Sequence, residues 1–242
     1  MPGNRRLYIV WAGSILTGAA LLAARPAVQG PETGSIAGEV RLSGPAAVDQ
    51  RVVTTDERYC GSEVPSEAIV AGSDGGLLNS VVYLEGLQHN GGSANTVLRL
   101  DNEGCAFVPH VQAGMAGSRL EVTNADPIMH NTHLFLQYGS RSRSLLNMAL
   151  PTAGVRLDAS RGARWPGVIE VRCDVHQWMS AYILLFEHPY YAVTDSLGRF
   201  RIEGVPVGTY TVKVWHETLG ELEDEVKVEP DKTASIAFLF GE

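Results

Sequence analysis

The stretch Gly167–Met179 reads GVIEVRCDVHQWM, and it contains the residues that best indicate the fold and chemistry of this 242-residue chain. Its first part, Gly167–Arg172, is rich in β-branched residues and predicts a strand. Directly after it come a thiol at Cys173, an imidazole at His176 and a thioether at Met179. A tight loop that leaves a strand can bring three such side chains to one point. The sequence therefore predicts a strand followed by a metal-binding loop.

Two imidazoles, a thiolate and a weak axial thioether form the ligand set of blue-copper electron-transfer sites. The loop provides all of these except one imidazole, which must come from elsewhere in the chain. The segment Met129–His133 (MHNTH) offers two, just after a predicted strand at Arg119–Thr123. Zinc is disfavoured because a set with Cys and Met is soft. A dinuclear copper centre is also disfavoured, since the loop contains no second cysteine.

The His-Asn pair at 130–131 and the later Cys-x-x-His-x-x-Met loop together resemble cupredoxins, and the loop spacing matches amicyanin most closely. The resemblance covers roughly residues 96–188. It implies a Greek-key β-sandwich or barrel holding one copper ion that cycles between Cu(I) and Cu(II). It also implies a ligand plane of His130, Cys173 and His176, with Met179 on a long axial bond. Asn131 would tie the two ligand segments together by hydrogen bonds, which fixes the ligand geometry.

The sequence departs from the family pattern near the site. Asp174 stands where a small hydroxyl residue is usual, which would change the hydrogen bonding to the sulfur. Two more histidines, His110 and His133, offer a second metal position, with ordinary structural or exposed histidines as the alternative. Strand alternation places His130 and His133 on opposite faces of one strand. Trp178 is expected to form an apolar patch where a redox partner approaches.

The three cysteines allow more than one pairing. In an oxidising compartment an odd count leaves one thiol unpaired, and a Cys60–Cys105 disulfide with Cys173 free is the partition that leaves a metal ligand. The alternative for Cys173 is a buried structural thiol or half of a disulfide with either of the others. Met179 could likewise be core filler rather than a ligand.

The rest of the chain predicts an all-β protein, because short apolar runs alternate with turn residues. The predicted strands are Ser35–Leu42, Ser80–Leu84, Thr96–Leu100, Arg119–Thr123, Gly167–Arg172, Ser180–Phe186, Arg199–Ile202, Thr209–Val214 and Glu225–Val228. A helical turn is considered only at Ser142–Ala149. Many short strands with regular turns indicate sandwiches or barrels.

The C-terminal part has a pattern of its own. The turn TDSLGRF at 194–200 and the stretch PVGTY at 206–210 resemble the carboxypeptidase regulatory-like, or transthyretin-like, β-sandwich. The segment Gly34–Val40 is similar to that family's opening strand. The expected organisation is therefore a signal at 1–30, a β segment at 31–95 that shares in the regulatory-like sandwich, a cupredoxin-like domain at 96–188 and the sandwich at 189–242.

The N-terminus has the pattern of an export signal. Arg5 and Arg6 precede an apolar run at Leu7–Ala24, and small and helix-breaking residues follow. An uncleaved membrane anchor is the alternative, because 18 apolar residues could nearly span a bilayer. Cleavage after residue 30 would leave 16 basic and 27 acidic residues, a formal charge of −11 and no membrane span. Nucleic acid is then excluded as a partner, because phosphate binding needs a basic surface.

Together these features predict an exported, periplasmic or extracellular, copper protein that is not an enzyme. It would pass single electrons between redox partner proteins such as a cytochrome or a dehydrogenase. Two alternatives stay open: a periplasmic copper storage or delivery protein, and a non-redox binding or structural module. An oxidase or nitrite reductase would need a second copper site, such as a cluster built on His110 and His133. The whole chain is similar to exported bacterial proteins labelled methylamine-utilisation proteins, a label that does not establish a role.

Overall fold

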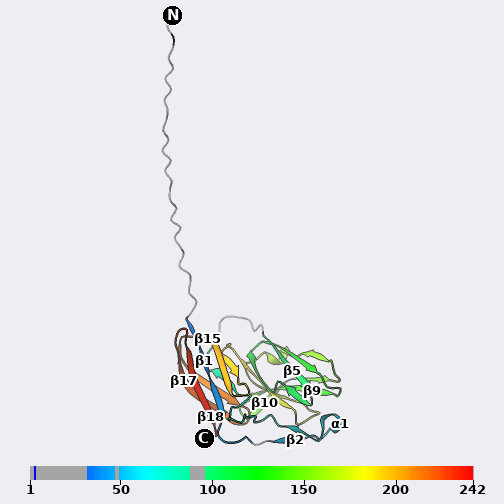
Figure 1. Cartoon of the computed structure of the whole chain (residues 1–242). Helices are drawn as coiled ribbons and strands as arrows, with labels where there is room; N and C mark the ends of the chain where they lie inside the picture. The colour runs from blue at the N-terminus through cyan, green and yellow to red at the C-terminus, as the bar shows by residue number, and fades with distance from the viewer. Residues whose placement is uncertain (1–2, 4–31, 47–48, 88–95, 242) are drawn as a thin grey trace. The chain divides into compact units, whose positions relative to one another are not determined.

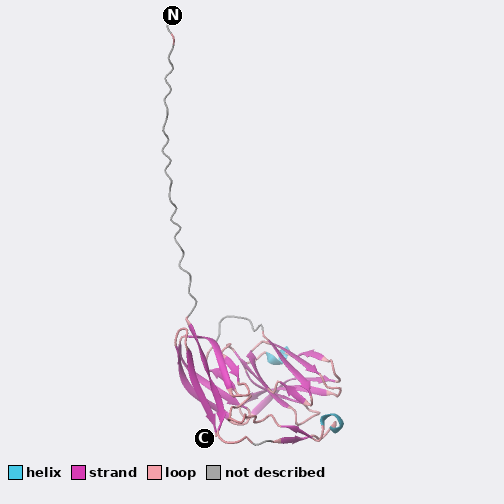
Figure 2. Cartoon of the chain, viewed as in Figure 1, coloured by secondary structure: helices cyan, strands magenta, loops and turns pink. Residues whose placement is uncertain are grey.

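The structure is a computed structural model that describes residues 3, 32–46, 49–87 and 96–241; the predicted signal at 1–30 lies outside this part except for Gly3. Strands make up almost all of the regular structure (Figures 1 and 2), as the all-β prediction requires. Within the described residues the two short exceptions are α1 (Glu57–Cys60) and the 3-10 helix η1 (Ser160–Ala163). No helix of the described part is long and apolar enough to cross a membrane.

The first of two β-sandwiches holds the predicted metal-binding loop. One of its sheets has the order β10–β9–β12–β13–β7 and consists of β10 (Arg141–Leu150), β9 (His130–Tyr138), β12 (Gly167–Arg172), β13 (Ser180–Phe186) and β7 (Val111–Met115). The other has the order β11–β8–β5–β6 and consists of β11 (Arg156–Asp158), β8 (Arg119–Asn124), β5 (Val97–Glu103) and β6 (Ala106–Val108). Both sheets are mixed, because β7 runs parallel to β13 and β5 parallel to β8.

Alternating burial along the strands explains why the two sheets face one another. In β5 the side chains of Leu98 and Leu100 are buried between exposed neighbours, and in β8 those of Leu120 and Val122 are buried. This period of two gives each strand one apolar face. These faces form a single core that also contains Cys173 and Met179. The metal-binding loop is therefore attached directly to the core of the first sandwich.

The second sandwich combines strands from both ends of the chain. Its sheets are β15–β1–β18 and β14–β4–β16–β17, formed by β15 (Arg199–Pro206), β1 (Thr33–Leu42), β18 (Thr233–Phe240), β14 (Tyr191–Val193), β4 (Val81–Leu84), β16 (Gly208–His216) and β17 (Gly220–Val228). β1 lies between β15 and β18, so the N-terminal strand is central to its sheet (Figure 1). A separate apolar core fills this sandwich.

The segment between β1 and β4 does not follow β1 into the second sandwich. It contains the hairpin of β2 (Gln50–Val52) and β3 (Glu63–Pro65), with α1 between the two strands. Val53, Cys60 and Val64 pack against the first core. The chain therefore starts one sandwich, contributes to the other and returns, so the cores do not follow the linear boundary at residue 96.

In the turn at 194–200, Asp195 and Gly198 have the roles that aspartate and glycine usually have in turns. Asp195 Oδ1 accepts hydrogen bonds from the backbone N–H groups of Leu197 and Arg199, both at 2.9 Å. Gly198 has φ +73°, and a Cβ there would lie 2.2 Å from the carbonyl oxygen of Val40. Only glycine fits this position, where the turn passes close to β1.

One secondary-structure expectation was wrong. Residues 142–149 form no helical turn but lie within β10, an edge strand paired with β9. Most of its side chains are exposed, so its sequence lacks the alternation that marks a half-buried strand.

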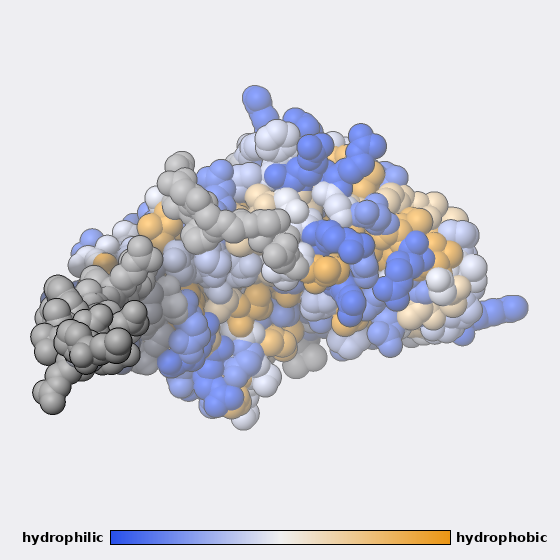
Figure 3. All heavy atoms as spheres, turned by 90° about the horizontal axis from the view of Figure 1, so that it is seen from above, coloured by the Kyte–Doolittle hydropathy of each residue, from blue (hydrophilic) through white to orange (hydrophobic). Residues whose placement is uncertain are grey.

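Polar and apolar side chains are intermixed on the face of the molecule shown in Figure 3. The exposed large apolar side chains come from many separate elements: Val52, Tyr59, Val97, Val108, Met129, Tyr138, Trp165, Leu197, Val207 and Leu239. Exposed apolar residues distributed in this way are ordinary on protein surfaces.

Candidate metal centre

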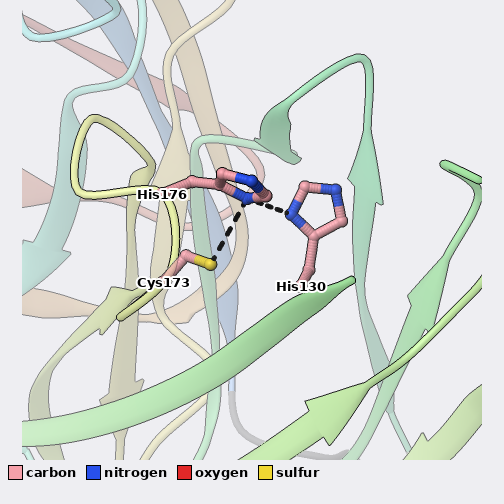
Figure 4. Close-up of side chains that lie close together, drawn as sticks. All are labelled: His130, Cys173 and His176. Carbon is pink, nitrogen blue, oxygen red and sulfur yellow. Dashed lines mark hydrogen bonds between the residues drawn. The ribbon is translucent and has the colours of Figure 1, made fainter. Parts of the chain in front are cut away.

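Three of the predicted ligands converge in the structure. The donor atoms of His130, Cys173 and His176 all lie within 4.8 Å of one another, and all three residues are buried. The two imidazole Nδ1 atoms are 2.9 Å apart, and Cys173 Sγ is 3.7 Å from His176 Nδ1. Figure 4 shows the three side chains pointing toward one another, one from the start of a strand and two from the loop.

The start of β9 is held in place by Asn124. The Asn124 carboxamide oxygen accepts the backbone N–H of Asp126 at 2.9 Å, and its Nδ2 donates to the carbonyls of Ile128 and Leu150. These bonds fix the turn that leads into β9, where His130 is the first residue. Because His130 shares the face of Leu134 and Leu136, its side chain points into the core.

The loop from Cys173 to Met179 is closed by its own backbone. Met179 N–H donates to the carbonyl of His176 at 2.9 Å, and Cys173 N–H contacts the carbonyl of Met179 at 3.4 Å. β12 and β13 pair without a gap up to this loop, with Arg172 opposite Ser180. Met179 is 3% exposed and packs in the same core as Cys173. The hairpin therefore holds Cys173, His176 and Met179 in one tight loop at the end of the core.

Asn131 connects the two ligand segments. Its carboxamide oxygen accepts the N–H of Asp174 at 2.6 Å and contacts the Cys173 thiol at 3.4 Å. The backbone N–H of Asn131 points at Cys173 Sγ at 3.5 Å. Two hydrogen-bonding groups of one residue thus face the sulfur, and they hold the loop against β9.

Each histidine of the cluster contacts a carboxylate through its outer nitrogen. His130 Nε2 lies 2.9 Å from Asp126 Oδ2, and His176 Nε2 lies 3.0 Å from Asp56 Oδ2. An ionised carboxylate only accepts hydrogen bonds, so Nε2 is the donor in each ring, and in a neutral ring Nδ1 then keeps its lone pair. Burial lowers the pKa of His130 and so favours the neutral ring, although Asp126 acts in the opposite direction. Both rings therefore present lone pairs to the same point.

This arrangement fits a metal ion. Two lone pairs facing each other at 2.9 Å repel, and a cation between them removes the repulsion. Nitrogen ligands lie about 2 Å and thiolates about 2.3 Å from zinc-sized ions, so donors separated by up to about 4 Å can share one ion. The Nδ1–Nδ1 and Sγ–Nδ1 distances of 2.9 and 3.7 Å both satisfy that limit.

Asp126 is itself well supported. It is 1% exposed and accepts the backbone N–H groups of Gly104 and Cys105, at 2.8 and 2.9 Å, and the hydroxyl of Tyr59 at 2.9 Å. Burial alone would raise its pKa, but these hydrogen bonds keep the pKa of Asp126 below its ordinary value. Asp126 is therefore an anion that holds His130.

Sequence reasoning missed Asp56, Tyr59 and Asp126. Asp56 is 120 residues from His176, so no local spacing relates the two. One sequence signal did link this segment to the site, namely the predicted Cys60–Cys105 disulfide. The structure contains that disulfide and buries Cys173 as a free thiol. That bond brings the segment around α1 to the metal centre.

His133 and Asp174 form a separate polar network on the outer face of β9. Both oxygens of Asp174 lie 3.1 Å from His133 Nδ1, and Asp174 also accepts hydrogen bonds from Asn131 and Asn147. His133 Nε2 contacts Ser144 Oγ at 2.8 Å. The structure thus places His133 on the side of the strand opposite His130. It puts Asp174 between His133 and Asn131.

His110 also lies apart from the cluster. Its Nε2 contacts a carboxylate oxygen of Glu217, and its Nδ1 lies 3.0 Å from the carbonyl of Ser180. In the described part of the chain, the three-residue cluster of His130, Cys173 and His176 includes neither His110 nor His133. Each of the two histidines has a carboxylate partner of its own.

The patch expected at Trp178 is not exposed. Trp178 is only 7% exposed, its Nε1 donates to the carbonyl of Cys105 at 3.1 Å, and its ring lies 4.9 Å from that of His176. Arg51 donates to its backbone carbonyl from β2. The residue that was expected to face a partner is therefore packed within the first core.

His130 starts β9, and the Cys-x-x-His-x-x-Met loop joins β12 to β13 in the same sheet. A family model described as polysaccharide lyase family 4, domain II, an fn3-type domain, matches residues 162–236. No curated protein matches the chain.

Several solved copper proteins are similar in structure at low sequence identity. The reduced state of an amicyanin mutant is 11% identical, with 43% of this chain and 98% of that chain covered and a TM-score of 0.32. A purple cupredoxin from Nitrosopumilus maritimus is 18% identical, covering 37% and 99% with a TM-score of 0.31. A copper-containing nitrite reductase from Thermus scotoductus SA-01 is 17% identical, covering 42% of this chain with a TM-score of 0.32; this chain spans only 25% of that one.

Proposed function

We propose that this protein binds one copper ion through His130, Cys173, His176 and Met179 and carries single electrons between redox partner proteins, without transforming a substrate. The observation that supports it most is the approach of the two imidazole Nδ1 atoms to 2.9 Å beside a buried free thiol. Bound there, copper would accept and return one electron by changing between Cu(II) and Cu(I).

The donor set favours copper over the other common metals. Thiolate and thioether are soft ligands, and two imidazoles with one thiolate and a weak thioether suit copper. Structural zinc sites instead use four Cys or His ligands in a closed tetrahedron. The free thiol of Cys173, in a chain whose other two cysteines are joined, is explained if a metal occupies it.

The surrounding residues keep the donors in place. Asn131 holds the loop against β9, Asp126 holds His130 and Asp56 holds His176. Both imidazoles are 0% exposed, so water is kept from the centre. A rigid, dry site changes little in geometry when its charge changes, and such a site exchanges electrons with a small reorganisation cost.

The same proposal places the protein outside the cytoplasm. The Cys60–Cys105 disulfide supports this location, because disulfides persist in oxidising compartments. The export signal expected at residues 1–30 agrees with it. The partner would be another exported redox protein, such as a cytochrome or a dehydrogenase.

A copper storage or delivery role is the second candidate. The complete burial of both imidazoles favours it, because an enclosed site holds its ion well but is less open to a redox partner. The two roles differ in the oxidation states that the site supports. A storage site needs to bind Cu(I) tightly, whereas a carrier must hold both states in one geometry.

The visible and EPR spectra of the mature chain loaded with Cu(II) test the proposal. We expect an intense thiolate-to-copper band and narrow copper hyperfine splitting, both absent in Cys173→Ser. His130→Ala should also abolish them, whereas the matched control His133→Ala, three residues along the same strand, should keep them. A pale Cu(II) spectrum with tight Cu(I) binding would favour storage. A pale spectrum indifferent to Cys173, without Cu(I) binding, would contradict both roles.

A further inference from the structure

The segment Asp49–Ser66, here called the strap, is a self-contained hairpin beside the metal centre. β2 and β3 pair with each other, and Val53 N–H donates to the carbonyl of Ser62 at 2.9 Å, just beyond the paired strands. α1 lies at the tip of this hairpin; Figure 1 labels α1 and β2. Among the described residues, β2 and β3 form a sheet only with each other. What holds it in place must therefore be contacts of its side chains.

Those contacts converge on the metal-binding loop and its supports. Arg51 donates to the carbonyl of Trp178 and Thr55 Oγ1 to that of Val175, both at 3.3 Å. Cys60 is joined to Cys105, which lies next to Gly104 on the chain. The strap is thus bound to the ligand loop by two hydrogen bonds. The disulfide binds it to Cys105, whose N–H donates to Asp126.

The tip of the strap reaches both histidines of the cluster. Asp56 directly precedes α1 and contacts His176 Nε2 at 3.0 Å. Tyr59, within α1, donates to Asp126, the carboxylate that holds His130. Two residues of one short turn therefore act on the outer nitrogens of both rings, one directly and one through Asp126.

Asp56 also closes the edge of His176. The His176 side chain is 0% exposed, whereas that of Asp56 is 42% exposed. The carboxylate therefore stands between the outer nitrogen of His176 and the solvent. Asp56 has φ +51°, a left-handed conformation that aspartate, asparagine and glycine tolerate better than other residues.

We propose that the strap completes the metal centre: Asp56 and Tyr59 are positioning residues that keep both imidazoles turned with Nδ1 toward the ion, and Asp56 covers the outer edge of His176. This inference rests on the metal site of the proposed function. It does not depend on electron transfer.

The backbone at Asp56 offers a clean test, because glycine keeps the left-handed conformation while it removes the carboxylate. Asp56→Gly should therefore leave the strap folded, and Asp56→Asn should remove only the charge. Glu57→Gln is the matched control, since it removes the same charge from the adjacent residue. Tyr59→Phe, with Tyr138→Phe as its control, tests the hydroxyl that supports Asp126.

Two measurements read the outcome. The first is the nitrogen-15 NMR spectrum of the imidazoles in the metal-free chain, which reports whether Nε2 carries the proton. We expect His176 to be Nε2-protonated in the wild type and in Glu57→Gln, and to lose this preference in Asp56→Gly. The second is the rate at which a chelator removes copper, which we expect to rise about 10-fold to 100-fold in Asp56→Gly, since lost outer partners of ligands typically weaken metal binding by that factor.

Asp56→Asn should fall between Asp56→Gly and the wild type, and Tyr59→Phe should loosen His130 rather than His176. The inference is overturned if Asp56→Gly keeps the wild-type protonation of His176 and the wild-type rate of copper release. If the wild type lacks the thiolate-to-copper band but its His176 protonation depends on Asp56, the proposed function fails and the strap's hold on the imidazoles stands.

Discussion

At the level of single residues, hydrogen-bonded carboxylates determine how the two histidines are turned. Asp126 and Asp56 each accept a hydrogen bond from the Nε2 of one ring, so the Nδ1 of each ring lies on the side of the Cys173 thiol. Outer partners of this kind fix the tautomer of a metal-binding histidine. The donor set is therefore preorganised before any ion enters.

Asn131 is the residue whose loss should loosen the centre most without removing a ligand. In Asn131→Ala the N–H groups of Asp174 and Val175 lose their acceptor inside the loop. Leaving such groups unpaired costs on the order of 1–3 kcal/mol, so we expect the free energy of unfolding in urea to fall by about that amount. The control is Asn147→Ala, which removes an exposed partner of Asp174 and the acceptor of Asn131 Nδ2 but leaves the loop N–H groups paired; it should change stability by less than about 0.5 kcal/mol. Equal losses in the two variants would contradict the role of Asn131.

The loop spacing predicted that Cys173 and His176 meet, and the resemblance to cupredoxins added His130 from the segment at 129–133. The same reasoning could not find Asp56 or Tyr59, which meet the site only through the fold of the strap. It also misjudged Trp178, which looked like a surface residue beside a ligand. Its ring is instead buried against His176, and its Nε1 donates to the carbonyl of Cys105.

At the level of the elements, nine of the eighteen strands in the described residues were predicted, because short apolar runs alternate with turn residues along the chain. β12 and β13 begin and end at the predicted residues. β10 was missed because as an edge strand it leaves most of its side chains exposed, and the polar stretch at 141–144 shows no period of two. The placement of β1 between β15 and β18 is a long-range pairing that only its family resemblance suggested.

The end of β16 makes stability depend on pH through His216. Burial lowers the pKa of His216 to about 4. Below the ordinary value of 6.5 the unfolded chain binds a proton that the folded chain does not, so this group destabilises the fold as the pH falls from 6.5 towards 4. The free energy of unfolding should decrease by at most about 1.4 kcal/mol per pH unit in that window.

Denaturant unfolding at several pH values tests this effect in the wild type and in His216→Asn. Asparagine can still accept the N–H of Thr218, as His216 Nδ1 does at 3.2 Å, but it does not titrate. The variant should therefore show a shallower slope between pH 6.5 and 4.5. The same slope in both proteins would mean that His216 is not the source of the pH dependence.

The disulfide is the covalent anchor of the strap. Cys60 and Cys105 are 45 residues apart, and closing a loop of that length stabilises a fold by about 4 kcal/mol in the chain-entropy account. We expect the double variant Cys60→Ser, Cys105→Ser to lose roughly 2–4 kcal/mol of unfolding free energy, measured in urea. It should also release copper faster, because Asp56 and Tyr59 are then less firmly held. A double variant as stable as the wild type would show that packing alone fixes the strap.

At the level of the whole molecule, charge determines which redox reagents approach. The chain has a formal net charge of −8, or −11 without residues 1–30. A negative field raises the encounter rate with cations and lowers it with anions, and added salt screens it. We expect the copper-loaded protein to exchange electrons faster with a cationic cobalt complex than with an anionic iron complex of equal driving force. Stopped-flow rates at low and high salt would show this, and rates that do not depend on reagent charge would contradict it.

The two sandwiches have separate cores but share segments of one chain. β1 and β4, both early in the sequence, belong to the second sandwich, whereas the strap between them packs against the core of the first. Because the chain passes from one sandwich to the other and back, a single domain boundary along the sequence could not be derived from composition. The metal centre consequently uses residues from two distant parts of the chain.

A redox titration of the copper-loaded mature chain, followed at the thiolate-to-copper band, tests whether this site carries electrons. We predict that the band bleaches and returns reversibly with one electron per protein, and that Cys173→Ser shows no such band to titrate. A band that is absent, or that is lost irreversibly on the first reduction, would contradict an electron-carrying copper site at His130, Cys173 and His176.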